Sequence, residues 1–191
     1  MENKNKKIIR SKKDLKNFIA QDKKRYQISN YPFLTRLIGG NEATRALSYL
    51  KTLRLLEYYT NCRHDIFGKI LKFWFEIRIR QKGLKYGIDI KPNTVGPGLY
   101  MPHIGGIHLN LLEMGENCIV TQNVVVGQKN VPENRATIGD NVELTLGSKI
   151  IGKVIIGDNV IVAPNSVVVK DIPAYSIVSG VPAKIIKQIN L

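Results

Sequence analysis

The side chains best suited to proton transfer in this chain are its three histidines, His64, His103 and His108. The unperturbed pKa of histidine lies closest to neutral pH, so each of them could act as a general base. His103 lies in a glycine-rich stretch with Gly105 and Gly106 just behind it, and His108 follows five residues later. Because His64 lies in a different region, the three do not supply the three-histidine set of a catalytic zinc site. We therefore expect no metal.

The two cysteines, Cys62 and Cys118, stand alone. They form neither a CxxC pair nor a disulfide framework, which favours a reducing compartment. The basic start of the chain lacks the apolar core of a secretory signal, and no apolar run is long enough for a transmembrane helix. The sequence thus predicts a cytoplasmic protein. Its 191 residues allow one ordinary domain, or one small domain with a satellite.

The net charge of +14 is distributed unevenly. Residues 1–87 hold 21 Lys and Arg against 7 Asp and Glu, whereas residues 88–191 hold 8 of each. The basic part carries no nucleic-acid motif, so we expect no nucleic-acid partner. A peripheral contact of this part with the inner face of an anionic membrane is compatible with its charge and its aromatic residues.

Residues 12–82 read as helices, with a break at 26–32. Asn41 is placed to cap a helix whose apolar side chains recur every three or four residues, at Ala43, Ala46, Leu47 and Leu50. A second helix is predicted from Ile66 to Gln81. Eleven of the sixteen glycines follow Gly87, and Val and Ile replace Leu there. We expect a basic α-helical region over 1–87 and a separate β domain over 88–191.

A period of six runs through the β domain. Stepping by six from Met114 gives ten positions, of which only Pro132 is not an aliphatic side chain or Met. The others are Met114, Val120, Val126, Ile138, Leu144, Ile150, Ile156, Val162 and Val168. This period fits a parallel β-helix, in which each sextet is a short strand and a corner, better than a β-sandwich.

The polar stretch 128–137 interrupts the period, which resumes in phase at Ile138. That behaviour predicts a loop ejected from one coil. Loops on rigid scaffolds often carry function.

The β domain resembles the hexapeptide-repeat acyltransferases. Within them it is similar to the serine O-acetyltransferases and to the acetyltransferases of bacterial surface-polysaccharide clusters. The resemblance spans about residues 86–189 and rests on the segment 98–107 around His103, on the Ile-Gly-Asp-Asn-Val hexads at 138–142 and 156–160, and on the block 179–186 around Gly180-Val181-Pro182-Ala183-Lys184. It implies a left-handed β-helix, whose coils form a triangular prism, and a homotrimer of such prisms. It also implies active sites between neighbouring prisms, with acetyl-CoA lying along the coils.

The resemblance assigns His103 as the catalytic base. In serine acetyltransferases an Asp in an Asp-Ile-x-Pro segment orients that base, and Asp89-Ile90-Lys91-Pro92 matches the segment with spacing one residue short. The resemblance thus implies Asp89 as the partner of His103. Glu113 is the second candidate for this partner. Acetyl transfer also requires hydrogen-bond donors for the tetrahedral oxyanion.

Arg135 stands where serine acetyltransferases place a histidine that contacts the serine carboxylate. An arginine could hold a carboxylate, a phosphate or a uronic acid. On the CoA side, the resemblance implies small residues in two late coils and a lysine for a phosphate. These cofactor-binding candidates are Thr145, Gly147, Ser148, Ala163, Pro164 and Lys184.

The sequence therefore predicts an acetyl-CoA-dependent O-acetyltransferase. The N-terminal helical region and the loop at 128–137 are shorter than those of dedicated serine acetyltransferases, and Arg135 replaces a histidine. These differences favour a sugar or polysaccharide-precursor hydroxyl as acceptor. The first alternative is a serine O-acetyltransferase of cysteine biosynthesis. An alternative of another class is a non-catalytic trimeric scaffold or membrane-surface binding protein.

Overall fold

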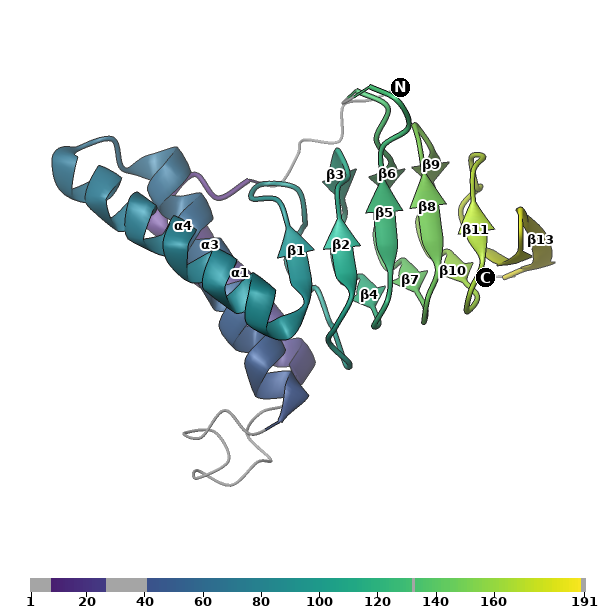
Figure 1. The fold of residues 1–191 in the computed structure, drawn as a ribbon, viewed down its shortest axis with the longest axis horizontal. Coiled ribbons are helices and arrows are strands. Elements are labelled where there is room, and N and C mark those ends of the chain that lie inside the picture. The colour runs from purple at the N-terminus through teal and green to yellow at the C-terminus, as the bar shows by residue number, and fades with distance from the viewer. Residues whose placement is uncertain (1–7, 27–40, 132, 190–191) are drawn as a thin grey trace.

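Three helices precede a column of short parallel strands in the computed structural model, which describes residues 8–26, 41–131 and 133–189 (Figure 1). The helices are α1 (Lys12–Tyr26), α3 (Glu42–Cys62) and α4 (Ile66–Tyr86). Asn41 caps α3 as predicted, because its side chain accepts a hydrogen bond from the Thr44 N–H at 2.9 Å. Of the predicted break at 26–32, only Tyr26 is among the described residues.

The junction between helices and strands depends on a glycine. Gly87 ends α4 in the left-handed conformation, with φ of 65°. A Cβ at this position would lie 2.9 Å from the backbone nitrogen of Gly106, in the next coil. Since Gly87 must be both left-handed and closely packed, the chain can turn from α4 directly into the first strand.

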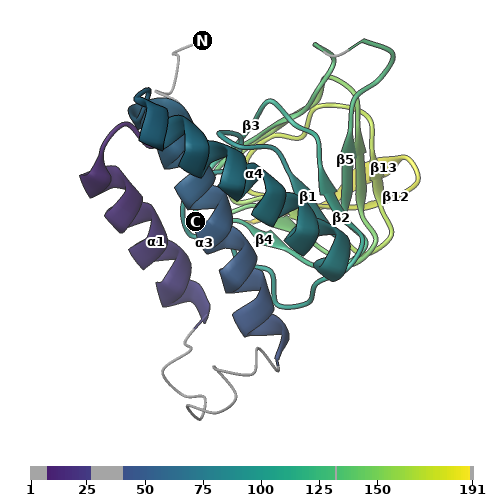
Figure 2. The same ribbon diagram turned by 60° about the vertical axis from the view of Figure 1, so that its left-hand side comes forward.

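The strands form three sheets, in the orders β1-β2-β5-β8-β11, β13-β12-β10-β7-β4 and β3-β6-β9. Their bounds are β1 (Ile88–Ile90), β2 (Ile107–Leu109), β3 (Glu113–Met114), β4 (Ile119–Val120), β5 (Val125–Gly127), β6 (Thr137–Ile138), β7 (Glu143–Leu144), β8 (Lys149–Ile151), β9 (Ile155–Ile156), β10 (Ile161–Val162), β11 (Val167–Val168), β12 (Ser176–Gly180) and β13 (Ala183–Gln188). The named pairs are parallel except β12 with β13. Figure 2, in which the helical end of the molecule is turned towards the viewer, shows the three sheets enclosing one prism. The predicted class, helices followed by a left-handed parallel β-helix, is confirmed.

The register explains why the period of six survives the loop. Leu144 pairs with Val162, so an ordinary coil advances by 18 residues. Val120 pairs with Leu144, so the coil that contains residues 128–136 advances by 24. The excess is one hexad, which leaves every later side chain on its original face of the sheet.

The prism core consists of the hexad side chains. All nine aliphatic or Met positions of the period are buried, with exposed fractions of 2% or less. A second set of inward-facing, smaller side chains is equally buried: Cys118, Val124, Val142, Ser148, Val154, Val160 and Ser166. Each coil contributes only a few of these side chains, so its stability depends on its neighbours.

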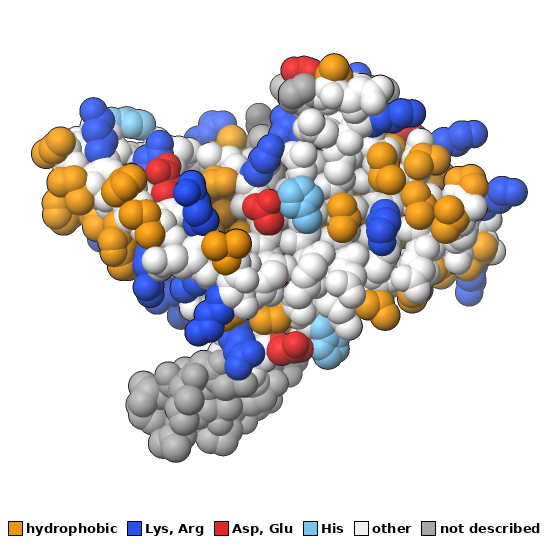
Figure 3. All heavy atoms as spheres, in the orientation of Figure 1, with side chains coloured by type: hydrophobic (Ala, Val, Ile, Leu, Met, Phe, Trp, Pro, Cys, Tyr) orange, Lys and Arg blue, Asp and Glu red, His pale blue; other side chains and the backbone are white. Residues whose placement is uncertain are grey.

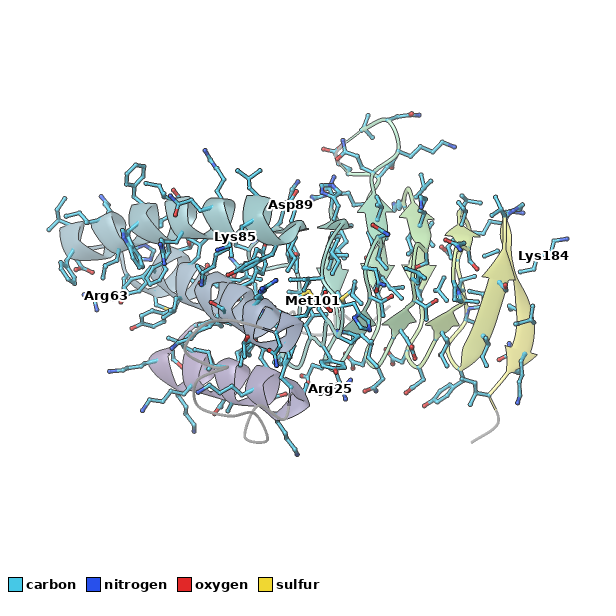
Figure 4. All side chains as sticks on the ribbon, turned by 60° about the horizontal axis from the view of Figure 1, so that its bottom comes forward. Arg25, Arg63, Lys85, Asp89, Met101 and Lys184 are labelled. Carbon is cyan, nitrogen blue, oxygen red and sulfur yellow. The ribbon has the colours of Figure 1, made fainter. Side chains whose placement is uncertain are left out.

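The helices complete the open end of the prism. Among the described residues no strand pairs with the first coil from outside, so its outer backbone groups need other partners. The Tyr49 hydroxyl of α3 accepts from the Ile90 N–H at 3.1 Å, and the Tyr26 hydroxyl of α1 accepts from the Met101 N–H at 2.9 Å. Burial raises the pKa of both tyrosines, so both hydroxyls stay protonated. Figure 4 shows Met101 at this junction of helices and coils.

Arg54 of α3 lies at the centre of this junction and is fully buried. Its guanidinium donates to the carbonyls of Val95 and Gly96 at 2.9 and 2.7 Å. Two buried carboxylates neutralise it, Asp22 at 2.9 Å and Glu57 at 3.1 Å.

The same carboxylates reach the coil. Asp22 accepts from the Gly98 N–H at 2.7 Å, and Glu57 accepts from the Asn93 N–H at 2.8 Å. One ion cluster therefore pairs four backbone groups of the first coil.

We predict that Arg54→Met lowers the free energy of unfolding by about 3–5 kcal/mol, because it leaves two buried carboxylates without their cation. Urea denaturation followed by circular dichroism measures this change. Arg63→Met is the matched control, since Arg63 pairs with Asp65 at 2.8 Å on the surface. Its unfolding midpoint should stay close to that of the unaltered chain. Equal midpoints for the two variants would contradict the role given to Arg54.

Candidate active site

His103 lies on the turn that leads from the first coil into β2. Met101, just before it, is fully buried, whereas 61% of the His103 side chain is exposed. The turn closes through Gly105 and Gly106, whose φ angles are 111° and 66°. The glycines thus project the imidazole from a rigid prism into solvent.

A carboxylate from α3 orients this imidazole. Nδ1 of His103 lies 2.9 Å from Oε2 of Glu42, in the first turn of α3. A carboxylate only accepts hydrogen bonds, so in the neutral imidazole Nδ1 carries the proton and Nε2 keeps its lone pair. This is the arrangement of a general base held by a third group.

The sequence reasoning missed Glu42. It lies 61 residues before His103, in a different structural element. The only signal in the sequence was an acidic residue directly after a predicted helix cap. That signal becomes informative only when α3 is known to pack against the first coil.

Asp89 contacts a different histidine. β1 and β2 pair in parallel with Asp89 opposite His108, and Nδ1 of His108 lies 2.9 Å from Oδ2 of Asp89. Both side chains point outward, because Ile88 and Ile90 flank Asp89 as buried residues. In the described residues Asp89 and His103 are therefore not brought together. Figure 3 shows a His and an acidic side chain in contact over the first strands.

The Asp89–His108 pair lines a groove of about 830 Å³ between α4 and the first two strands. Apolar side chains form much of its wall, among them Leu56, Ile79 and Pro92. Lys72, Arg80 and Lys91 add positive charge. His103 is not among the residues that line it. The chain thus presents two separate His–carboxylate pairs, one in this groove and one at the start of α3.

The loop over residues 128–136 leaves the prism between β5 and β6. At its start, Gln128 accepts a hydrogen bond from the Asn110 side chain at 3.3 Å, two residues after His108. Arg135 lies at its end and is partly buried, and its Nε has no hydrogen-bond partner in the described part of the chain. The loop therefore places a cation with unused hydrogen-bonding capacity beside the second coil.

The candidates for CoA binding lie in later coils. Residues 145–148 and 163–165 share one corner of the prism in successive coils, since the Asn165 N–H donates to the Leu146 carbonyl at 2.8 Å. Pro164 is exposed, and Thr145 and Ala163 are partly exposed. Gly147 and Ser148 are buried, and the Ser148 hydroxyl faces the prism interior.

Lys184 belongs to β13, at the end of the prism remote from the helices, and extends into solvent (Figure 4). The sequence candidates for CoA binding therefore lie along the prism axis and not around His103.

In the described residues, no group of three or more His, Cys, Asp or Glu side chains is arranged to hold a metal ion. Likewise, none of the helices that the structure describes is long and apolar enough to cross a membrane.

No known protein-family model matches the chain. Over 106 residues it is 36% identical to the serine acetyltransferase of Staphylococcus aureus strain Mu50, a match that covers 53% of this chain and 50% of the relative. The chain thus spans about half the length of the curated relatives it matches.

Solved structures are similar over nearly the whole chain. The serine acetyltransferase of Brucella abortus strain S19 superposes with a TM-score of 0.72 at 19% identity, covering 94% of this chain and 71% of the other. A serine acetyltransferase in complex with CoA gives 0.67 at 21% identity, covering 92% and 71%. These structures show the fold, and with the sequence match they confirm the resemblance to hexapeptide-repeat acyltransferases of the serine acetyltransferase type.

Proposed function

We propose that this chain is an acetyl-CoA-dependent O-acetyltransferase. The observation that carries the proposal is the His103–Glu42 pair, an exposed imidazole held by a carboxylate on the turn where the resemblance expects the base. The sequence match to serine acetyltransferases and the fold shared with a CoA complex support the same chemistry.

The comparisons favour serine as the acceptor. The short N-terminal helical region, the short loop and Arg135 favour a sugar hydroxyl, but the similar proteins are named serine acetyltransferases. Arg135 is compatible with serine, because a guanidinium can hold a carboxylate through two parallel hydrogen bonds. The serine alternative is thus better supported than our first preference.

In the proposed reaction, Nε2 of His103 accepts the proton of the acceptor hydroxyl as its oxygen attacks the thioester carbonyl. The C–S bond then breaks, and the protonated imidazole returns its proton to the departing sulfur. Glu42 holds the imidazole through Nδ1 in both steps and stabilises its transient positive charge. The histidine ends in its starting protonation state.

We also propose a homotrimer, with each acceptor site between two prisms. Several aliphatic side chains remain exposed on the prism sheets, among them Ile151, Ile155 and Val169 at 38%, 47% and 45%. Packing prisms against one another would remove such surface from water. Closed threefold symmetry satisfies this need with one repeated interface.

We predict that the particle in solution has three times, or a multiple of three times, the 21.5 kDa mass of the chain. Multi-angle light scattering at several concentrations measures this mass. A stable species of 21.5 kDa would contradict the trimer.

His103→Ala should lower the turnover of acetyl transfer by about two to four orders of magnitude, the range for loss of a general base. Its matched control is His108→Ala, which removes the other paired histidine and should leave most of the activity. Glu42→Gln and Asp89→Asn form the second matched pair, and only the first should reduce turnover. CoA affinity, measured by calorimetry, should change little in His103→Ala. The reverse ranking of the two histidines would move the site to the groove beside α4.

Thiol release from acetyl-CoA should be fastest with L-serine in a panel that includes simple sugars and nucleotide sugars. Arg135→Ala should then raise KM for serine more than it lowers kcat, because a clamp on a remote carboxylate contributes mostly uniform binding. Lys129→Ala removes another loop cation and serves as the control. Turnover of a sugar with none of serine would restore the glycan acceptor, and no turnover at all would favour the non-catalytic scaffold.

A further inference from the structure

Helix α4 presents an unusual number of large apolar side chains to solvent. Their exposed fractions run from 41% to 85%. They are Ile66, Phe67, Ile70, Phe73, Trp74, Ile77 and Leu84. Figure 3 shows hydrophobic side chains gathered over this helix, with Lys and Arg beside them. We call these seven residues the α4 stripe.

The stripe is a continuous face of the helix. Ile66, Ile70, Phe73 and Ile77 follow one another at intervals of four, three and four, which places them in line along one side. The opposite side packs on α3, where Phe75 stacks on Tyr59 with ring centroids 5.5 Å apart. Lys82 donates on the same side to Ser48 and Thr52 at 2.7 Å. Helix α4 therefore has two contact faces: one packs on α3, and the α4 stripe on the other side is exposed to solvent.

Positive charge accompanies the stripe. Helix α4 contains six basic residues and one acidic residue, Glu76, which lies 3.7 Å from Lys72. Lys69 and Arg80 lie on one flank of the stripe by helical spacing, and Arg78 and Lys85 lie on the other.

This charge argues against two protein occupants. A second α4 would bring its own flanking cations against Lys69, Arg78, Arg80 and Lys85 of the first, which is repulsive. The prism of another copy carries equal numbers of acidic and basic residues, so it offers no complementary charge. A partner that has an apolar layer beneath dense negative charge would complement both the apolar stripe and the flanking cations of α4.

An anionic lipid surface has that composition. Interfacial helices carry aromatic and aliphatic side chains on one face with Lys and Arg at its margins, and cations near such a surface add to the attraction. We propose that α4 docks on an anionic membrane surface, with the stripe in the headgroup region and the flanking cations at the lipid phosphates. This site contains neither His103 nor Glu42 and does not depend on the proposed activity, although Leu84 and Arg80 also line the groove of the Asp89–His108 pair.

The chain supplies its own reporter for this contact. Trp74 is its only tryptophan, it belongs to the stripe, and 49% of it is exposed. Vesicles of phosphatidylcholine with phosphatidylglycerol should shift its emission to the blue, and brominated lipids should quench it. Pure phosphatidylcholine vesicles should have a much smaller effect. Because the flanking charges are exposed, high salt should weaken the binding.

Two double variants separate the apolar and the charged contributions while keeping Trp74. Ile70→Gln with Phe73→Gln, and Lys69→Gln with Lys85→Gln, should each reduce partitioning into anionic vesicles by about tenfold or more. Ile185→Gln with Ile186→Gln is the matched control for the first, since these side chains of β13 are 45% and 65% exposed. Lys170→Gln with Lys187→Gln is the control for the second. Both controls should bind as the unaltered chain does.

Three results would overturn the proposal. Equal binding to neutral and anionic vesicles would remove the electrostatic selectivity. Trp74 emission that is already blue without lipid, together with a smaller particle mass in the Ile70→Gln/Phe73→Gln variant, would assign the stripe to contact between copies of the chain. Absence of any spectral change with anionic vesicles, in a chain whose circular dichroism is intact, would leave the stripe without a lipid role.

Discussion

The structure depends on how the first coil of the prism is closed. A β-helix stacks coil on coil, so every coil but the first finds hydrogen-bond partners on the one before. The first coil finds them on side chains of α1 and α3: two tyrosine hydroxyls, one guanidinium and two carboxylates. An open edge of this kind invites pairing with other strands. Here the helices remove the edge, at the cost of burying three charges. Burying those charges is tolerable because the carboxylates neutralise Arg54 and the coil supplies the remaining partners.

The hexad pattern made the prism predictable. An inward side chain every sixth residue is a local property, and the structure buries every aliphatic or Met member of the series. Even the ejected loop was visible, because it adds a whole hexad and leaves the phase intact. The helical ends were less predictable: α4 continues to Tyr86, five residues beyond the expected end at Gln81. The extra turn packs where the first strands begin, and this tertiary contact leaves no periodic signal in the sequence.

The pairing of the site residues was not predictable from one sequence. The resemblance placed Asp89 upstream of His103 with a spacing one residue short. In the structure, the parallel register sets Asp89 opposite His108 instead. Register decides which outward side chains meet, and a shift of one residue reverses the face that each one occupies. The role of Glu42 could not be predicted from the sequence for a different reason. Its contact with His103 depends on the position of one helix end against one turn, which neither propensity nor spacing encodes.

The two roles of α3 are physically coupled. This single helix carries Glu42 at its start, Tyr49 in its middle, and Arg54 and Glu57 near its end. The last three fix the helix on the first coil through hydrogen bonds to Ile90, Val95, Gly96 and Asn93. Since α3 is one continuous helix, anchoring it from Tyr49 to Glu57 also fixes the direction of its first turn. The carboxylate that holds His103 is therefore positioned by buried contacts about two to four turns away along the helix. The cluster that closes the prism edge is thus also what orients the candidate base, although it touches neither histidine nor substrate.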